Sequence, residues 1–598
     1  MASAAAFTAG AVSVLALVRF RAKARRGQKG KAATKVTLRI VNVTDVYMLD
    51  NFPSLKTLLA AKRAENTDGP TVSVLTGDFL APYLLSSIDF GRGMMAMLNA
   101  TPIDYVIWGN HEHDLPHRHC CARVRDYKGT WINTNMQSHE TFAQHQVDHA
   151  VVEATSPDGT LTRRVAFLGL LTDQKSLYAP NAFGGATIDD PWKTARDYVD
   201  GTKLPRDLDL VVPLCHFYEP QDEITCRDFE FPLVLSGHDH HKVDRVIAGT
   251  RLVKSGSDAH YAAVVDLTWD ASAPAGAPPA ISVEHVKVSD YAPDAALQAA
   301  VAKAYAALDD LKHTQLTTIP ATFRPLSSVG ARQRNTTAGA FLCGQFRDAF
   351  NADAATPHAE LVLMDGGDVR GGREYAEGAH FSMEALRSEL HEKLTMCVLE
   401  MPGSVIEDAI REKNYHGPDA YFLQWDDGLE VDGATQRVVR VGVGWVGLGS
   451  GTEGAPFDRD RIYRVGYPFP EIFAENGPAS IRNYFRAHPE LVPPEDAARG
   501  GQEFLLQHWA HGVWRRVWAA LDTDGDGAVD ASEFAALDLD GDRSVSSVEM
   551  LKFMRERLGL DVSEAEAAFA LYVLRAGGDR DRDGNLTWSE FQSSAGAQ

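Results

Sequence analysis

The 598-residue sequence is 44% hydrophobic and 23% charged, which excludes a disordered chain and indicates several globular domains. Nine of its 59 Lys and Arg residues lie before Asp45, where no acidic residue occurs, so 50 basic residues face 81 acidic ones in the rest. Such an acidic body disfavours nucleic acid as a partner. Six cysteines are too few for a disulfide scaffold, and adjacent Cys120 and Cys121 suit a reducing compartment.

Residues 1–35 form a basic N-terminal anchor or targeting segment. Residues 4–18 are apolar but short for a spanning helix, and the basic cluster follows them, which reverses the order of a secretory signal peptide. Three interpretations stay open: a signal anchor with its basic flank in the cytoplasm, an organelle transit peptide, or a disordered tail. Membrane association through residues 4–18 belongs to the first interpretation, and secretion is not clearly indicated.

From residue 36, short apolar runs alternate with helical segments, as in a layered α/β domain spanning 36–290. The expected strands are 36–43, 71–76, 103–108, 164–171, 208–214, 231–236 and 251–267, and the expected helices are 52–65, 91–100 and 190–200. A Pro/Ala-rich surface loop is expected over 271–280. The alanine-rich segment 293–312 predicts one long helix, which we assign to a linker of residues 291–315 between domains.

A second α/β domain is predicted over residues 316–495. Its helix is expected at 335–350 and its strand at 359–364, and the strand leads into the glycine-rich turn 365–372. The backbone N–H groups of such a turn, together with Arg370, could hold an anionic group. From residue 501 the pattern changes to an apolar stripe at helical spacing, which includes Trp509, Trp514 and Trp518.

Three segments after this stripe match the calcium-binding loop of EF-hands, which places oxygen ligands at positions 1, 3, 5, 7, 9 and 12. The predicted calcium ligands are Asp522, Asp524, Asp526, Ala528, Asp530 and Glu533 in the first loop; Asp538, Asp540, Asp542, Ser544, Ser546 and Glu549 in the second; and Asp579, Asp581, Asp583, Asn585, Thr587 and Glu590 in the third. Residues 501–598 are therefore expected to form an all-α calcium-binding domain.

The spacing of the loops predicts which of them pair. Loops one and two begin 16 residues apart and leave room for one short helix, whereas loops two and three begin 41 apart, enough for an exiting and an entering helix. We therefore expect loop two to pair with loop three. Loop two has Arg543 where the sharp turn favours glycine, so this bulky residue must adopt a positive φ.

Three strand-end motifs carry the chemistry of the first domain. They are Thr76-Gly77-Asp78-Phe79, the segment Trp108 to Asp114 (Trp-Gly-Asn-His-Glu-His-Asp), and Ser236-Gly237-His238-Asp239-His240. Each follows an apolar run that predicts a buried strand, and ligands in α/β sheets bind just beyond the carboxyl ends of strands. Clusters of Asp, Asn and His at these positions predict one metal site assembled from distant segments.

A pair of metals that hydrolyses phosphate esters needs a bridging carboxylate, with His and Asn completing each set of ligands. Asp78 suits the bridge, Asn110, His216 and His238 suit one metal, and Asp45 and His240 suit the other. His111 could stabilise the phosphoryl group or protonate the leaving oxygen, and Asp114 could hold its imidazole in orientation.

On these motifs, residues 36–490 resemble the metallophosphoesterase superfamily and, within it, the 5'-nucleotidase family. The resemblance implies a four-layer α/β sandwich, a second domain of the 5'-nucleotidase C-terminal type that presents nucleotides to the metals, and Mn, Zn or Fe as cofactors. The resemblance also implies that the glycine-rich turn and an aromatic side chain bind the substrate. The residues concerned are Gly366, Gly367, Arg370 and Phe422.

Two departures from the family pattern bear on this interpretation. Tyr47 replaces a metal-binding histidine, so either its phenolate binds the metal and favours a harder ion, or the side chain points away. Asp365 replaces the Asn of the glycine-rich turn and adds negative charge where substrate is expected. We expect a 5'-nucleotidase-like phosphoester hydrolase with calcium-binding loops. The alternative is a catalytically degenerate, calcium-responsive binding protein on the same scaffold.

Overall fold

The computed structural model describes residues 35–598, apart from 179–180, 202, 271, 311–314, 354–355, 377, 392, 415–421, 443–453, 476, 527–528, 560–563, 576–584 and 596–598. Residues 1–34 of the predicted N-terminal segment therefore lie outside the described part, and its three interpretations stay open. Within the described residues, every helix is too short or too polar to cross a lipid bilayer.

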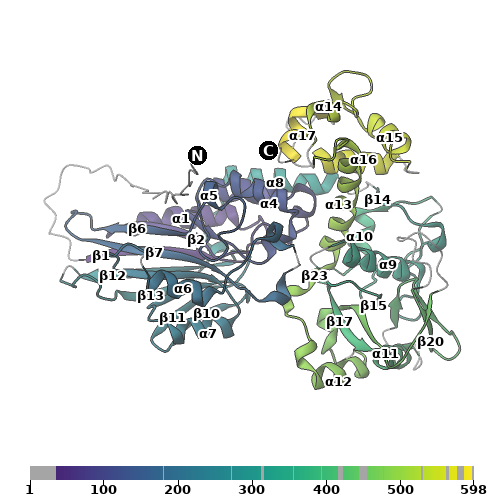
Figure 1. The fold of residues 1–598 in the computed structure, drawn as a ribbon, viewed down its shortest axis with the longest axis horizontal. Coiled ribbons are helices and arrows are strands. Elements are labelled where there is room, and N and C mark those ends of the chain that lie inside the picture. The colour runs from purple at the N-terminus through teal and green to yellow at the C-terminus, as the bar shows by residue number, and fades with distance from the viewer. Residues whose placement is uncertain are drawn as a thin grey trace, which may run out of the picture.

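Two β-sheets stack face to face in the first domain (Figure 1). The first sheet has the order β13-β12-β1-β2-β3-β4-β5, and the second has the order β10-β11-β9-β8-β7-β6. The strands of the first sheet are β1 (Lys35–Val43), β2 (Thr71–Leu75), β3 (Tyr105–Ile107), β4 (Thr130–Ile132), β5 (Gln146–Val147), β12 (Tyr261–Asp270) and β13 (Ala280–Lys287). Those of the second are β6 (His149–Thr155), β7 (Thr162–Leu171), β8 (Leu210–His216), β9 (Leu233–Ser236), β10 (Lys242–Ile247) and β11 (Thr250–Ser255).

Apolar side chains from both sheets meet in one buried layer, with Ile40 and Val74 on one side and Phe167 and Leu214 on the other. Helices cover the two outer faces. These are α1 (Phe52–Glu65), α3 (Arg92–Ala100) and α8 (Ala295–Asp310) on the first sheet and α6 (Pro191–Val199) and α7 (Glu219–Asp228) on the second. The domain is thus layered helix, sheet, sheet, helix, in agreement with the predicted layered α/β fold.

Most predicted elements of this domain lie within two residues of the observed ones, but the predicted strand 251–267 is wrong. It is two strands, β11 and β12, which belong to different sheets. The chain breaks at Gly256, whose φ of 97° favours glycine, and Asp258 and Ala259 also have positive φ. The predicted linker helix forms α8, which packs on α1 and α3 and buries Leu297 in the core of the first domain.

The second domain is built on a five-stranded sheet with the order β18-β15-β22-β17-β23. Its strands are β15 (Leu361–Asp365), β17 (Thr395–Pro402), β18 (Leu423–Trp425), β22 (Ile462–Pro468) and β23 (Arg499–Gly500). Helices α9 (Thr337–Ala352), α11 (Gly403–Asn414) and α12 (Ala479–Ala487) pack against it. A smaller sheet combines β19 (Leu429–Val431), β20 (Val438–Val441) and β21 (Ala455–Pro456). Residues Gln315–Thr317 (β14) pair with Phe381–Ser382 (β16), ahead of α10 (Met383–Glu389).

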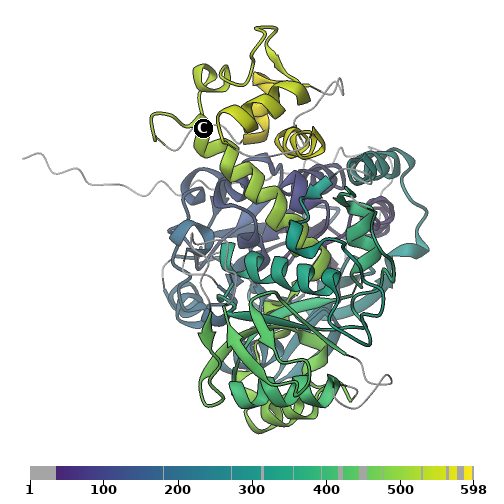
Figure 2. The ribbon, with the colours of Figure 1, turned by 90° about the vertical axis from the view of Figure 1, so that its right-hand side faces the viewer.

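Helix α13 (Gly501–Leu521) starts at β23 and runs along both α/β domains into the C-terminal helices, which lie above them (Figure 2). Its predicted apolar stripe is buried against both domains. Trp509 donates a hydrogen bond to Gln345 of α9 (2.6 Å), whereas Arg118 of the first domain stacks on Trp514 and Trp518. The stripe is therefore an interface between domains and not only the core of a calcium-binding unit.

The C-terminal part is helical around two very short strands. Its elements are α14 (Ala531–Phe534), β24 (Ser544–Val545), α15 (Ser547–Glu556), α16 (Glu564–Arg575), β25 (Leu586–Thr587) and α17 (Trp588–Ala595). Strand β24 pairs antiparallel with β25, so Val545 of loop two lies opposite Leu586 of loop three. This is the pairing that the loop spacing predicts.

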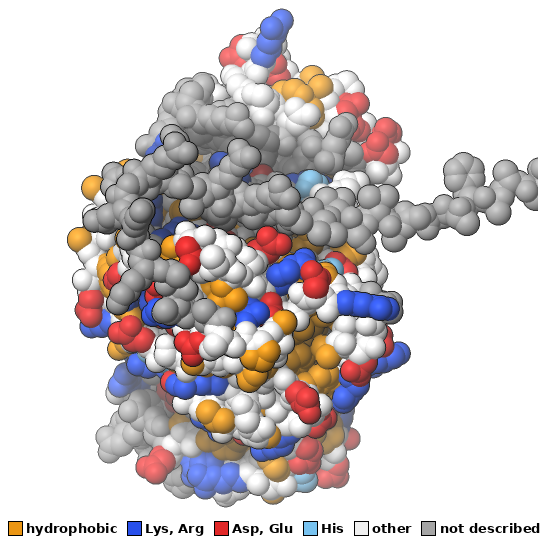
Figure 3. All heavy atoms as spheres, turned by 90° about the vertical axis from the view of Figure 1, so that its left-hand side faces the viewer, with side chains coloured by type: hydrophobic (Ala, Val, Ile, Leu, Met, Phe, Trp, Pro, Cys, Tyr) orange, Lys and Arg blue, Asp and Glu red, His pale blue; other side chains and the backbone are white. Residues whose placement is uncertain are grey.

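The face of the molecule opposite the second domain carries acidic and basic side chains interspersed with apolar ones (Figure 3). The described surface in this view shows no continuous basic patch.

Candidate metal centre and catalytic loop

The strand-end motifs meet at the carboxyl edges of the two sheets. Asp45 follows β1, Asp78 follows β2 and Asn110 follows β3 in the first sheet. His216 ends β8 and His238 follows β9 in the second sheet. Parallel strands present their carboxyl ends at the same edge of a sheet. The five side chains therefore meet at this edge, although almost two hundred residues separate the first from the last.

The predicted metal ligands form a compact cluster. The Nε2 atom of His216 lies 3.0 Å from Asp78 Oδ2 and 3.8 Å from Asp45 Oδ1. Asp78, His216 and His238 offer ligand atoms that all lie within 4.8 Å of one another. The Nε2 atom of His240 lies 3.5 Å from Asp45 Oδ1 and so joins the opposite side of the cluster.

The buried donor set fits metal ions. The Nδ1 atom of His216 lies 2.7 Å from the carbonyl oxygen of Thr76, which can accept its proton and leave the Nε2 lone pair for a metal. Asp45 Oδ1 is buried and accepts no hydrogen bond from the described residues. Burial would lower the pKa of His216, but the carboxylates of Asp78 and Asp45 raise it to about 10. The cluster therefore favours positive charge at its centre.

The backbone at this edge is held in conformations that most residues avoid. Asp45, Asp78, His238 and His240 all have positive φ, between 52° and 85°. Non-glycine residues persist in such conformations where the surrounding structure enforces them, and such sites cluster at functional centres. A Cβ atom at Gly109 would lie 2.1 Å from Asp78 Oδ1. Only glycine therefore lets the catalytic loop, the segment Trp108 to Asp114 after β3, approach this carboxylate.

Tyr47 points into the cluster. Its hydroxyl donates to Asp78 Oδ2 at 3.2 Å and lies 3.0 Å from His240 Nε2. The backbone N–H of Tyr47 donates to Asp258 at 2.9 Å, which fixes the residue from behind. Of the two alternatives that the sequence leaves open, the inward orientation is therefore the observed one.

His111 and Asp114 form a buried pair beside the cluster, in the 3-10 turn η1 (His111–Asp114). The Nδ1 atom of His111 lies 2.8 Å from Asp114 Oδ2, and its backbone N–H donates to Asp78 Oδ1 at 2.8 Å. Arg499 forms an ion pair with the same Asp114 oxygen. Burial would raise the pKa of Asp114, but the charges of Arg499 and His111 outweigh it and hold the pKa below its ordinary value.

Glu112 lies beside the cluster but is not among the predicted site residues. Its carboxylate is buried and accepts backbone hydrogen bonds from Phe79 (2.7 Å), Leu80 (3.1 Å) and Gly109 (2.6 Å). It therefore ties the loop after β2 to the loop after β3. Burial and the nearby charge of Asp78 raise the pKa of Glu112 to about 7. Its place directly after Gly109, Asn110 and His111 is the sequence feature that points to it.

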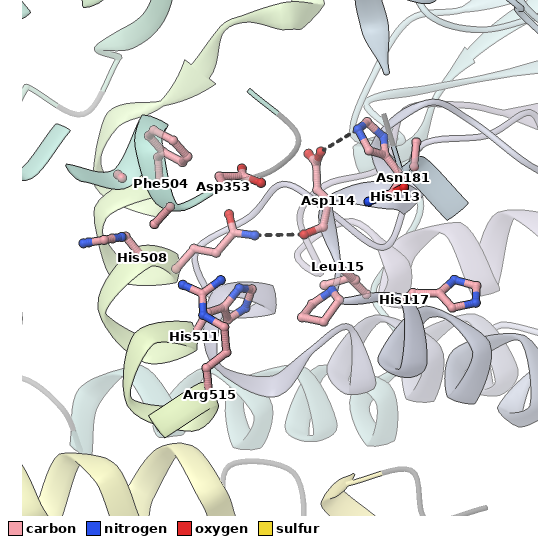
Figure 4. A pocket seen from close by; sticks show the side chains of 15 residues that line it. His113, Asp114, Leu115, His117, Asn181, Asp353, Phe504, His508, His511 and Arg515 are labelled. Carbon is pink, nitrogen blue, oxygen red and sulfur yellow. Dashed lines mark hydrogen bonds and ion pairs between the residues drawn. The ribbon is translucent and has the colours of Figure 1, made fainter. Parts of the chain in front are cut away.

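The second domain faces this centre through a different surface from the predicted one. A cavity of about 60 Å³ is lined by Asn110 and His111 from the first domain and by Val398, Pro493 and Arg499 from the second. A larger cavity of about 230 Å³ lies behind Asp114, between the catalytic loop and α13, where Gln507 donates to the Asp114 carbonyl oxygen at 2.9 Å (Figure 4).

The predicted substrate residues lie elsewhere in the second domain. Gly366 donates its N–H to the carbonyl oxygen of Phe422 (2.8 Å), and Arg370 donates to the carbonyl oxygen of Gly367 (3.1 Å). The described contacts of this turn are thus within its own domain and do not bring Arg370 to the metal cluster. Burial and the charges of Asp365 and Glu471 raise the pKa of Asp368 to about 7, so this turn is acidic.

Two of the predicted calcium loops gather carboxylates. The ligand atoms of Asp522, Asp524 and Glu533 lie within 4.8 Å of one another in loop one, as do those of Asp538, Asp540 and Glu549 in loop two. Arg543 has a φ of 74°, the positive value expected of a bulky residue at the glycine position. Ala528 of loop one and Asp579, Asp581, Asp583 and the Glu590 side chain of loop three lie outside the described residues.

Comparison with known proteins identifies the first domain and its fold. Residues 38–242 match the family model of calcineurin-like phosphoesterases, whereas no curated protein sequence matches the chain. Among solved structures, NAD nucleotidase (NadN) of Haemophilus influenzae is similar at 14% identity over 80% of this chain and 97% of its own, with a TM-score of 0.62.

Two further structures cover similar shares at lower similarity. A putative 5'-nucleotidase of Staphylococcus aureus has 14% identity, covers 79% of this chain and 96% of its own, and has a TM-score of 0.48. A 5'-nucleotidase precursor of Thermus thermophilus has 16% identity, the same coverage and a TM-score of 0.46. Of these three, the NAD nucleotidase structure is similar enough to support the fold. The family match covers residues 38–242, which carry the candidate metal cluster. This segment is therefore similar to the calcineurin-like phosphoesterases, and the protein is a phosphoester hydrolase.

Proposed function

We propose that the protein releases phosphate from nucleotides or related phosphoesters at a two-metal centre, and that its C-terminal loops bind calcium. The observation that carries the hydrolase proposal is the convergence of Asp45, Asp78, His216 and His240 beside the His111–Asp114 pair. Asn110, His238 and Tyr47 complete the proposed ligand set.

Two metals of the manganese, zinc or iron type would supply a nucleophilic hydroxide and positive charge for the phosphoryl oxygens. The chain contributes the other functions. Asp78 lies between the two halves of the cluster and suits a bridging ligand. His111 is fixed through Nδ1, so its Nε2 atom can donate a proton to the leaving oxygen. Asp114 stabilises the charged imidazole, and Arg499 keeps Asp114 ionised.

A nucleotide substrate is supported by the fold shared with NAD nucleotidase and by the second domain, but the chain departs from the family in the base-binding region. The glycine-rich turn that holds Gly366, Gly367 and Arg370 also carries Asp365 and Asp368. These carboxyl groups disfavour a phosphate there and suit a group that donates hydrogen bonds, such as a nucleobase or ribose. Phe422 lies 5.7 Å from Trp425, ring to ring, and the two offer an aromatic platform.

The test of the hydrolase proposal is phosphate release by the full chain. Nucleoside monophosphates, diphosphates, cyclic phosphates and an aryl phosphate are offered with manganese, zinc or iron. His111→Ala should lower turnover at least a hundredfold. The matched control is His241→Ala, an exposed histidine next to His240 that contacts Glu219 and its own loop. Equal turnover in His111→Ala and wild type would contradict the proposal.

We further propose that calcium acts on the hydrolase through helix α13. Loop one begins at Asp522, directly after the helix ends, and the helix begins two residues after Arg499. Along its length Glu503 accepts from Ser87 through its carbonyl oxygen (3.2 Å), and Gln507 contacts Asp114. A calcium-dependent shift of this helix would therefore reach the His111–Asp114 pair.

Calcium should change kcat of the wild-type protein. The change in kcat on adding calcium should be smaller in the Gln507→Ala variant. Gln507 is not among the proposed metal or substrate ligands. Turnover without calcium therefore measures catalysis itself, and the change on adding calcium measures the coupling. If calcium binds but leaves kcat of the wild type unchanged, calcium serves stability alone and the coupling proposal fails.

A further inference from the structure

A second cluster of metal-binding side chains lies outside the catalytic centre. Helix α4 (His117–Asp126) begins three residues after Asp114, and its residues His117 and Cys121 are one turn apart on the same face. The loop before α5 (Phe142–His145) brings His139 and Glu140 to that face. None of these four residues belongs to the proposed catalytic cluster.

Two distances within this cluster match those of a tetrahedral site. Cys121 Sγ lies 3.5 Å from His117 Nε2, and the same nitrogen lies 3.1 Å from Glu140 Oε2. A tetrahedral zinc ion with ordinary bond lengths separates sulfur and nitrogen ligands by about 3.6 Å and nitrogen and oxygen ligands by about 3.3 Å. Ligand atoms of His117, Cys121 and His139 all lie within 4.8 Å of one another.

His139 provides an independent indication that a ligand is bound. Its side chain is buried, with 2% exposed, and its Nε2 atom makes no hydrogen bond to any described residue. The Nδ1 atom lies 2.9 Å from the Thr141 hydroxyl oxygen and accepts the Thr141 backbone N–H at 3.4 Å. When a metal binds at Nε2, the ring proton can move to Nδ1, where the Thr141 hydroxyl oxygen can accept it.

The surroundings of His117 orient the ring without closing its edge. A Cβ atom at Gly184 would lie 2.4 to 2.6 Å from Nε2, Cδ2 and Cε1, so the Gly184 backbone covers the face of the ring. Figure 4 shows the ring directed away from helix α13, while His117 also lines the cavity behind Asp114. The Glu140 side chain is 55% exposed, which leaves a path for an ion to enter.

We propose that His117, Cys121, His139 and Glu140 form a four-coordinate site for a zinc-type metal ion, separate from the catalytic metals. One thiolate, two imidazoles and one carboxylate suit zinc and disfavour calcium or magnesium, which select oxygen ligands. Cys121 is a thiol in the metal-free protein, because burial and Glu140 raise its pKa. Binding therefore forms a metal–sulfur bond and releases the thiol proton to solvent. The bound ion joins α4 to the loop of His139 directly behind the catalytic turn.

Cobalt(II) titration of the full-length, metal-depleted protein tests this site. A thiolate ligand gives cobalt a near-ultraviolet charge-transfer band, and the catalytic cluster, which offers only nitrogen and oxygen, cannot produce it. We expect the band in wild type and in the matched control Cys120→Ala, and its complete loss in Cys121→Ala. Cys120 is the adjacent cysteine, is equally buried and lies outside the cluster.

A second variant keeps the test decisive if Cys121→Ala fails to fold. Glu140→Ala removes an exposed side chain, so the protein should fold normally and bind cobalt at the thiolate site at least tenfold more weakly. Zinc content of the purified wild type should exceed that of Cys121→Ala by one equivalent. Absence of the band in folded wild type, its persistence in Cys121→Ala, or unchanged cobalt affinity in Glu140→Ala would overturn the four-ligand site.

Discussion

Arg499 pairs with Asp114 across the boundary between the two α/β domains, so the residue that contacts His111 is itself held by the second domain. The Asp114 side chain is 2% exposed and that of Arg499 is 9% exposed, which makes this a buried ion pair. Removing one member of such a pair leaves an uncompensated charge.

We expect Arg499→Ala to lower kcat by roughly ten- to a hundredfold, since His111 loses its support. The charge of Arg499 holds the pKa of Asp114 down, so its loss raises that pKa. Protonation of Asp114 then begins at a higher pH, and the acid limb of the kcat profile moves upward. Arg499→Lys should restore part of both effects. Unshifted pH profiles in Arg499→Ala, beside an Arg486→Ala control on the surface of α12, would contradict the role.

Glu112→Gln should loosen the catalytic loops. The amide group of glutamine can replace one carboxylate oxygen but turns a donor toward the other backbone N–H groups, which costs about 1–3 kcal/mol of unfolding free energy. We expect a lower melting temperature and loss of catalytic metal. The exposed Glu495→Gln serves as the control, and both variants are compared by thermal unfolding and by metal analysis.

Gly109→Ala should abolish turnover, because its Cβ would overlap Asp78 Oδ1 and displace this carboxylate from the candidate metal cluster. The control is Gly512→Ala in α13, where an added Cβ meets nothing within 4 Å and should stabilise the helix by up to about 1 kcal/mol. Activity and metal content decide the outcome: full metal occupancy in Gly109→Ala would refute the steric argument.

Asp89 makes folding stability depend on pH. This buried residue accepts N–H groups from Gly91 and Gly93, yet burial raises its pKa to about 6 from about 3.8 in the unfolded chain. The folded state therefore binds the extra proton, and stability falls as pH rises from about 4 to about 6, by about 3 kcal/mol. Asp89→Asn should flatten that slope in denaturant unfolding at several pH values. An identical slope in the variant would show that another group is responsible.

Calcium should raise the melting temperature and change the tryptophan fluorescence, because loop one follows the helix that carries Trp509, Trp514 and Trp518. Saturation at a hundred times the dissociation constant stabilises a folded protein by about 2.7 kcal/mol. The double variant Asp522→Ala and Asp538→Ala should lose both responses. A signal that stays flat through the millimolar range in wild type would rule out calcium sensing by this helix.

The sequence predicts what is local and misses what depends on distant packing. Helix 52–65 and the ligand motifs could be assigned because apolar periodicity and strand-end glycines are visible over a few residues. Arg499 could not, since 385 positions separate it from Asp114 and nothing in its neighbours marks an ion pair. His117, Cys121 and His139 carry no recognisable motif either, because a helix turn and a loop of irregular length bring them together.

The contacts of Asp114 with Arg499 of β23 and Gln507 of α13 also have a consequence for folding during synthesis. Asp114 leaves the ribosome long before Arg499 and Gln507, so a nascent chain can fold its first domain while the catalytic turn still lacks both partners. Hydrolysis by the growing chain should therefore stay weak until synthesis has passed residue 521, and a chain truncated before residue 499 should keep the fold of its first domain but not its full turnover.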